Sequence, residues 1–210
     1  FRAGLAVLRG VPIDHAPSWM QYDPRLDALV AAGSRYPELR EWALAHNISE
    51  SIAAGTDAAG AFDAPLLDPR IPREAQQEAV TRWVAAGRRG TVVLPTGAGK
   101  TLVALMAIHR TGMNACVIVP TRALVTQWFT QLADAFGAAH VGAFYGDEKE
   151  VRALTVTTYH SAFTLLERHG ARFALLVCDE VHHLADSATG DARTRLDALI
   201  IAPAAYRLGL

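Results

Sequence analysis

The sequence has few cysteines, and their placement excludes two common kinds of site. Only 2 cysteines occur among the 210 residues, and no CxxC spacing is present, so neither metal nor redox chemistry is indicated. Both cysteines, Cys116 and Cys178, lie in apolar runs that have the length of strands. We expect them to be reduced residues of the core.

Charge of one sign and long apolar runs are also lacking. The net charge of −1 provides no global basic field for nucleic acid, although a local patch stays open. The apolar stretches are interrupted by proline, glycine or charge, so no membrane helix is expected, and Phe1-Arg2-Ala3-Gly4 begins no signal peptide. We therefore expect an intracellular protein without a membrane partner, cytoplasmic or, in a eukaryote, nuclear.

The residues that are present suffice for one substantial domain and an appendage. A hydrophobic content of 51% can fill a real core. Residues 1–48 are predicted to form a small α+β unit, with a strand over 4–9 and a helix over 35–47. Residues 49–71, rich in Ala, Gly, Asp and Pro, predict a linker. The sequence starts without Met and stops inside a predicted strand, so we expect a fragment of a longer protein.

Predicted helices and strands alternate over residues 72–210. Helices are expected over 72–86, 100–111, 122–136, 159–169 and 192–200. Strands are expected over 91–95, 115–120, 141–145, 154–157, 173–178 and 206–210. This alternation predicts a three-layer α/β domain with a mainly parallel sheet.

A glycine-rich turn between a predicted strand and a predicted helix has the spacing of a phosphate-binding loop. Glycines let backbone N–H groups curl around phosphate oxygens, and the amino end of the helix adds positive potential. Lys100 is predicted to reach the β and γ phosphates of ATP, and the Thr101 hydroxyl to ligate Mg²⁺. The general pattern has a glycine where this chain has Leu94. The predicted nucleotide-binding stretch is Pro95, Thr96, Gly97, Ala98, Gly99, Lys100 and Thr101.

A second stretch takes the apolar run 175–178 directly into Asp179-Glu180-Val181-His182-His183. Mg²⁺ in a phosphate-loop enzyme needs a carboxylate held opposite the loop, and a strand tip delivers one rigidly. Asp179 is therefore the predicted metal ligand, and Glu180 the group that orients and deprotonates the attacking water. His182 is predicted to sense the γ-phosphate, whereas His183 needs only a packing or solvated role. A zinc site would require more ligands than this stretch offers.

Together these motifs resemble the first motor domain of superfamily 2 helicases. Pro95-Thr96-Gly97-Ala98-Gly99-Lys100-Thr101 and Asp179-Glu180-Val181-His182-His183 are similar to the XPB-type branch, named after xeroderma pigmentosum group B. Val119-Pro120-Thr121-Arg122-Ala123-Leu124 and Thr155-Val156-Thr157-Thr158-Tyr159 lie between these two motifs in the expected order. The small unit is similar to the end of that branch's damage-recognition domain, and Arg207-Leu208-Gly209-Leu210 to the strand before its coupling motif. The resemblance implies a RecA-like domain over 72–210.

The resemblance also implies roles for residues outside the two main motifs. Arg73 and Gln76 match the adenine-reading segment, although the family's aromatic residue before the glutamine is Ala75 here. The segments that hold the nucleic-acid backbone are matched by Thr121, Arg122, Thr157 and Thr158. Each of these threonines is also a plausible cap or turn residue. Trp128 and Phe129 fit the core better than a base-stacking surface.

By resemblance the function is that of an ATP-dependent DNA helicase or translocase, in which Mg²⁺-ATP hydrolysis opens or remodels duplex DNA. Its partners would be DNA and a second RecA-like domain of the same full-length chain, which would carry the arginine finger. The fragment alone is expected to bind ATP and hydrolyse it poorly. Two alternatives stay open: the motor subunit of a restriction or defence system with a nuclease partner, and a DNA-binding module with a vestigial nucleotide site. Intact Lys100, Thr101, Asp179 and Glu180 argue against the vestigial site.

Overall fold

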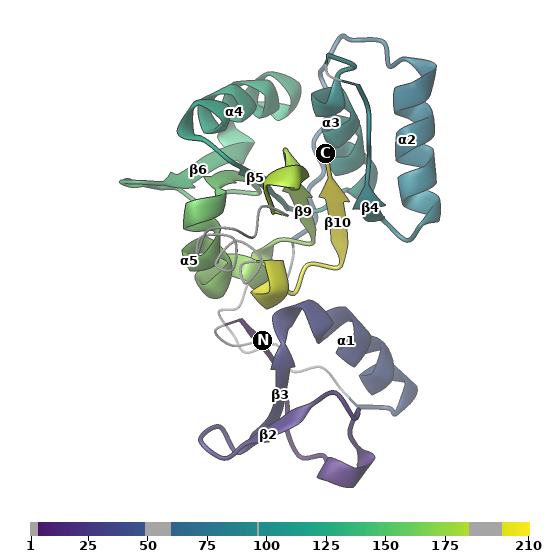
Figure 1. Cartoon of the computed structure of the whole chain (residues 1–210), viewed down its shortest axis with the longest axis vertical. Coiled ribbons are helices and arrows are strands. Elements are labelled where there is room, and N and C mark those ends of the chain that lie inside the picture. The colour runs from purple at the N-terminus through teal and green to yellow at the C-terminus, as the bar shows by residue number, and fades with distance from the viewer. Residues whose placement is uncertain (1–3, 49–59, 96, 185–198) are drawn as a thin grey trace.

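The structure, a computed structural model, describes residues 4–48, 60–95, 97–184 and 199–210, which form a small unit and a larger one (Figure 1). In the small unit three antiparallel strands, ordered β1-β3-β2, pack with one helix around the buried Leu29 and Leu39. Its elements are β1 (Leu5–Leu8), β2 (Gln21–Asp23), β3 (Ala28–Ala32) and α1 (Tyr36–Ala45). The predicted strand over 4–9 and helix over 35–47 are confirmed to within two residues at each end.

The larger unit is built on a seven-stranded sheet with the order β4-β10-β9-β5-β8-β6-β7. Every neighbouring pair is parallel except the hairpin formed by β6 and β7. Its strands are β4 (Arg89–Thr91), β5 (Ala115–Val119), β6 (Val141–Tyr145), β7 (Glu148–Lys149), β8 (Leu154–Thr158), β9 (Leu175–Cys178) and β10 (Tyr206–Gly209). The predicted α/β class with a mainly parallel sheet is confirmed.

Helices cover both faces of this sheet, which makes the unit three layers thick. The alternation of side chains along β5 sends Val117 into one core, shared with α2, α3 and α4, and Ile118 into a second core, shared with α5. The helices are α2 (Glu74–Ala85), α3 (Lys100–Thr111), α4 (Arg122–Phe136) and α5 (Tyr159–His169). In the part of the chain that the structure describes, no helix has the length and apolarity needed to cross a membrane.

One predicted strand differs from the strand observed, and one predicted helix lies mostly outside the described residues. The strand expected over 91–95 is instead β4, an edge strand paired only with β10. After Thr91 the pairing continues only through the Val92 amide, which donates to the Gly209 carbonyl at 2.9 Å. Proline at position 95 lacks the N–H that a longer ladder would need. Of the helix expected over 192–200, residues 192–198 lie outside the described residues, and 199–201 are helical.

The second half of the predicted linker packs on the larger unit. Residues 49–59 lie outside the described residues, but Phe62 is only 5% exposed and belongs to the core beneath α4. Its ring meets the Phe136 ring edge-on, with centroids 5.5 Å apart. Because Phe62 fills the core, the larger unit begins near residue 60.

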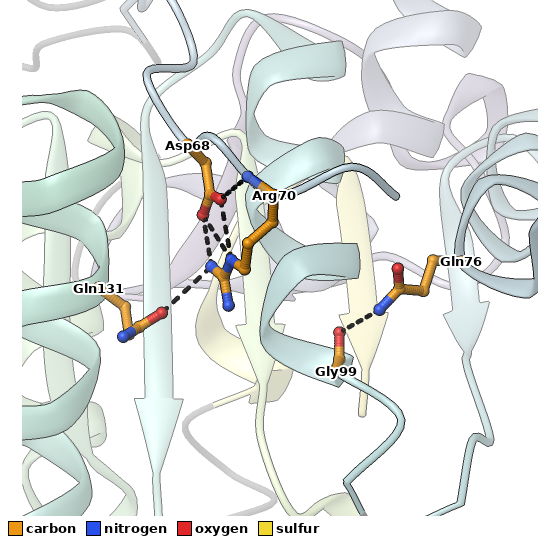
Figure 2. A network of polar contacts seen from close by, with 5 residues as sticks. All are labelled: Asp68, Arg70, Gln76, Gly99 and Gln131. Carbon is orange, nitrogen blue, oxygen red and sulfur yellow. Dashed lines mark hydrogen bonds and ion pairs between the residues drawn. The ribbon is translucent and has the colours of Figure 1, made fainter. Parts of the chain in front are cut away.

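A polar network ties the same segment to α4 (Figure 2). Arg70 Nε donates to both carboxylate oxygens of Asp68, at 2.8 and 3.0 Å, and an η-nitrogen donates to Gln131 Oε1 of α4 at 3.2 Å. Hydrogen bonding to this guanidinium lowers the pKa of Asp68. The chain therefore enters α2 from a fixed starting point.

The buried cysteines give a first prediction. Cys116 and Cys178 are unpaired thiols of the core, as expected, and burial raises the pKa of Cys178 to about 12 and that of Cys116 still further. Neither thiol should react with iodoacetamide in the folded protein at pH 8, and both should react after unfolding, which peptide mapping checks. Because the thiolate is disfavoured only in the folded state, the free energy of unfolding should fall as pH rises from about 9 towards 12. Rapid labelling of either cysteine in the folded protein at pH 8 would contradict this burial.

Candidate nucleotide site and nucleic-acid edge

The predicted phosphate loop leads into α3. Gly97 and Gly99 have φ angles of 78° and 79°, a left-handed region that glycine enters without strain, and Gly99 is the N-cap of α3. Lys100 and Thr101 follow as the first residues of this helix. Within the described residues neither side chain makes a hydrogen bond, so both remain available to a phosphate or a metal. Pro95 and Ala98 lie in the same loop, and Thr96 lies outside the described residues.

Gln76 connects the start of α2 to this loop (Figure 2). Its side chain is 5% exposed; Nε2 donates to the Ala98 and Gly99 carbonyls at 2.8 and 3.2 Å. Its Oε1 accepts the Arg73 backbone N–H at 2.8 Å. The amide group predicted to recognise adenine is thus occupied by protein in this conformation. Adenine reading by Arg73 and Gln76 stays a prediction, and it requires that these bonds be exchanged.

Asp179 is fixed by hydrogen bonds at all four of its polar groups. Its backbone N–H donates to the Ile118 carbonyl at 2.9 Å, and its own carbonyl accepts the Tyr159 hydroxyl at 3.0 Å. Carboxylate Oδ1 accepts the Glu180 N–H at 2.9 Å. Oδ2 accepts the indole N–H of Trp128 at 2.7 Å. Each carboxylate oxygen retains a lone pair, so a metal ion can still be bound.

Glu180 and His182 follow Asp179 in an unusual backbone conformation. The φ angle of Glu180 is 51°, in the left-handed region that costs a non-glycine residue about 1 kcal/mol or more. His182, in the short 3₁₀ turn Val181–Leu184, brings Nδ1 within 3.3 Å of Glu180 Oε2. Strain of this kind concentrates at functional sites. The two predicted catalytic side chains therefore contact each other, and both lie partly in solvent.

Topology brings the phosphate loop and Asp179 to the same end of the sheet, the end at which the parallel strands have their carboxyl termini. The loop follows β4 and Asp179 follows β9, and only β10 lies between these parallel strands. With neighbouring strands about 4.8 Å apart, β4 and β9 are separated by about 10 Å. Mg²⁺ in such sites takes one or two protein ligands besides phosphates and water. One hydroxyl (Thr101) and one carboxylate (Asp179) fit that ion, and the described residues hold no cluster of three His, Cys, Asp or Glu for another metal.

The predicted nucleic-acid residues lie further along the same edge. Thr121 is the N-cap of α4 and accepts the Leu124 N–H at 3.3 Å, and Thr158 is the N-cap of α5 and accepts the Ser161 N–H at 3.2 Å. The capping roles considered for both threonines are thus present. Arg122 is exposed, whereas Thr157 is fully buried and donates its hydroxyl to the Phe144 carbonyl at 2.6 Å. The geometry favours a structural role for Thr157.

A cavity of about 520 Å³ opens between these two helix starts. Its lining includes the cationic or titratable side chains of Arg122, Lys149 and His160 and the hydroxyls of Thr158, Ser161 and Thr164. Donors of this kind suit phosphate oxygens. Lys149 and His160 were not predicted from the sequence, because nothing marks them until β6, β7 and α5 fold around one opening.

The contact between Trp128 and Asp179 was not predicted from the sequence. Trp128 is 2% exposed, so its predicted place in the core is confirmed, and Phe129 packs against the same core. A buried indole N–H must find an acceptor, which is the one signal that pointed to a polar partner. Which acceptor it finds depends on the packing of α4 against the end of β9, where Asp179 lies 51 residues after Trp128 in the chain.

Comparison with known proteins agrees with this geometry. The sequence model of the family described as "Type III restriction enzyme, res subunit" matches residues 70–210, more than half of the chain. The chain belongs to this family. Among solved structures, the UvsW helicase from bacteriophage T4 superposes with a TM-score of 0.52 at 18% identity, over 90% of this chain and 73% of that chain. The likeness confirms the predicted RecA-like fold.

Curated relatives specify the branch within superfamily 2. The chain is 34% identical over 197 residues to the DNA 3'-5' translocase XPB2 of Sulfurisphaera tokodaii, covering 93% of this chain and 42% of that relative. It is 35% identical over 109 residues to the DNA 3'-5' helicase XPB of Mycobacterium tuberculosis, covering 47% of this chain and 20% of the relative. The predicted resemblance to XPB-type helicases is confirmed, and the alternatives are not favoured. The chain spans less than half the length of either relative.

Proposed function

We propose that this chain is the ATP-binding half of a DNA helicase or translocase of the XPB type. The observation that carries the proposal is the convergence of the glycine loop at Lys100 and the rigidly held Asp179 on one edge of a parallel sheet. The relatives named as XPB helicases and translocases support DNA as the substrate. ATP, with Mg²⁺, is the proposed cofactor.

Each residue has a distinct proposed role in hydrolysis. Backbone amides of 97–101 and the Lys100 ammonium bind the phosphates, and Thr101 with Asp179 holds Mg²⁺, which neutralises charge on the phosphoryl group. Glu180 orients the water and accepts its proton. His182, in contact with Glu180, reports the state of the γ-phosphate. Thr121, Arg122 and Thr158 bind the DNA backbone at the adjacent edge.

The proposed domain layout rests on the resemblance to XPB-type helicases and on the packing of residues 60–71. Residues 1–48 are the end of a damage-recognition-like domain and 72–210 are the first RecA-like domain. Residues 60–71, predicted as the second half of a linker, pack on the motor through Phe62 and Arg70 and are counted with it. A second RecA-like domain of the full-length chain supplies the arginine finger, so this half alone binds ATP and hydrolyses it poorly. The proposed partners are DNA and a repair or nuclease factor, and the proposed compartment is the cytoplasm, or the nucleus in a eukaryote.

The test is phosphate release by the full-length protein with and without duplex DNA. Duplex DNA is expected to stimulate Mg²⁺-dependent ATP hydrolysis, and no Mg²⁺-dependent hydrolysis under either condition would overturn the proposal. Arg122→Ala is expected to weaken DNA binding at every sequence and to reduce the slope of log affinity against log salt by about 1. Arg82→Ala is the matched control, because Arg82 is an exposed arginine of α2 whose ion pair, among the described residues, is with Glu78. An equal change of slope in both variants would remove Arg122 from the interface.

A further inference from the structure

Asp179 is held from both faces of the sheet by two buried aromatic side chains. Trp128 reaches its carboxylate from the core beneath α4, and Tyr159 reaches its backbone carbonyl from the core beneath α5. Both side chains are 2% exposed. Neither belongs to the predicted site, and each donates the one polar hydrogen that its ring carries.

Both side chains also lie on helices α4 and α5, which begin beside the cavity proposed to bind nucleic acid. Tyr159 is the first residue of α5, directly after its N-cap Thr158, and Trp128 lies on α4 less than two turns after Arg122. Arg122 and Thr158 line the same cavity. Binding of a phosphate backbone that shifts the start of α4 would therefore move the Trp128 bond to Asp179. A shift of the start of α5 would move the Tyr159 bond to the same residue.

We propose that Trp128 and Tyr159 are positioning residues that couple nucleic-acid binding at the starts of α4 and α5 to Mg²⁺-nucleotide binding at Asp179. The inference rests on the proposed function. Trp128 orients the carboxylate, because a charge-assisted bond from a fixed indole allows the Asp179 side chain one rotamer. Tyr159 holds the backbone of Asp179 in place through the hydrogen bond from its hydroxyl to the Asp179 carbonyl. Neighbours that orient a metal ligand in this way typically change metal affinity by about 10- to 100-fold when removed.

The chain offers a matched control for Trp128. Trp83 of α2 is likewise buried, at 4% exposure, and its indole N–H donates to the Arg207 carbonyl of β10 at 2.9 Å and not to Asp179. Trp128→Phe and Trp83→Phe therefore remove the same atoms and one buried indole hydrogen bond each, to a carboxylate in the first variant and to a backbone carbonyl in the second. Tyr159→Phe removes a single hydroxyl and preserves the ring.

The first measurement is equilibrium binding of a fluorescent ATP analogue to the full-length protein as Mg²⁺ is titrated. Trp128→Phe is expected to raise the Mg²⁺ concentration at half-saturation about tenfold. Tyr159→Phe is expected to raise it about threefold, as for the loss of one neutral hydrogen bond. Trp83→Phe should leave the Mg²⁺ concentration at half-saturation unchanged, although its thermal stability should also fall, because it too loses a buried hydrogen bond.

The second measurement is the factor by which saturating duplex DNA changes the affinity for the Mg²⁺-bound analogue. Binding linkage requires that nucleotide change DNA affinity by the same factor, so both directions are measured. In Trp128→Phe and Tyr159→Phe, DNA is expected to change the nucleotide affinity by a factor closer to 1, which means weaker coupling. In Trp83→Phe this factor should stay at the wild-type value. Equal shifts in the Trp128 and Trp83 variants, or an unchanged factor in both Asp179-linked variants, would overturn the inference.

The outcomes separate this inference from the proposed function. If the wild-type protein shows no Mg²⁺-dependent binding of the ATP analogue, the proposed function and the coupling are both overturned. A wild-type protein that shows both binding and DNA linkage, with variants that behave alike, would overturn the coupling alone. Should Trp128→Phe fail to fold, Tyr159→Phe decides the matter, because it removes one atom from a ring that stays in place.

Discussion

Glu180→Gln is expected to lower the rate of DNA-stimulated ATP hydrolysis by about 100- to 10,000-fold, the usual contribution of a general base. Glutamine has the shape of glutamate and can still orient a water, but it cannot accept the proton. The backbone at this position already has a φ of 51°, and the substitution leaves the Cβ unchanged, so the local fold should persist. The measurement is steady-state phosphate release by the full-length protein at saturating ATP and duplex DNA.

Nucleotide binding separates this result from a general loss of structure. Glu180→Gln should bind the Mg²⁺-ATP analogue with nearly the wild-type affinity, because Mg²⁺ is assigned to Asp179 and Thr101. Glu78→Gln is the control, since Glu78 is an exposed carboxylate that pairs with Arg82 at 2.6 Å on the outer side of α2. An unchanged rate in Glu180→Gln would remove the proposed mechanism, and a loss of nucleotide affinity would reassign Glu180 to binding.

Lys100→Ala is expected to lower kcat/KM for ATP by about 100- to 1,000-fold, the effect of removing one preorganised charge-stabilising donor. The lysine is the first residue of α3, and its ammonium adds to the positive amino end of that helix. Alanine favours the helix, so the loss should appear in nucleotide affinity and turnover, and thermal stability without nucleotide should stay close to wild type. Calorimetric titration with the ATP analogue and steady-state kinetics measure both quantities.

The second of the two lysines in the chain provides the contrast. Lys149 of β7 donates to the Gly146 carbonyl and lines the cavity at the nucleic-acid edge. Lys149→Ala should weaken DNA binding and leave nucleotide affinity in the absence of DNA at the wild-type value. Equal losses of nucleotide affinity in Lys100→Ala and Lys149→Ala would contradict the assignment of Lys100 to the phosphates of ATP.

Local chemistry explains which elements the sequence predicted well. The start of α4 follows from Thr121 as N-cap, the start of α5 from Thr158, and the end of α3 from Gly112, whose φ is 61°. These signals lie within one turn of the boundary that they set. The phosphate loop and the acids after β9 were equally local, so the residues that we assign to the nucleotide could be named from the sequence.

Other features depend on residues that meet only after folding. The place of β10 between β4 and β9 is a matter of topology, and no pattern in Tyr206–Gly209 encodes it. Thr157 matched a nucleic-acid-binding segment by resemblance, but β8 lies inside a sheet covered on both faces, so even the Thr157 hydroxyl is buried. The Gln76 amide depends in the same way on where the phosphate loop settles against α2.

The burial of Phe62 bears on how the motor can be separated from the rest of the protein. A polypeptide cut at residue 72, where the helical pattern starts, would leave the Phe136 ring without its aromatic neighbour and α4 without the Arg70 anchor. Loss of a buried phenylalanine commonly costs about 3 to 5 kcal/mol, a large share of the stability of a domain this size. An excised motor domain should therefore start near residue 60, so that residues 60–71 keep their contacts with α4.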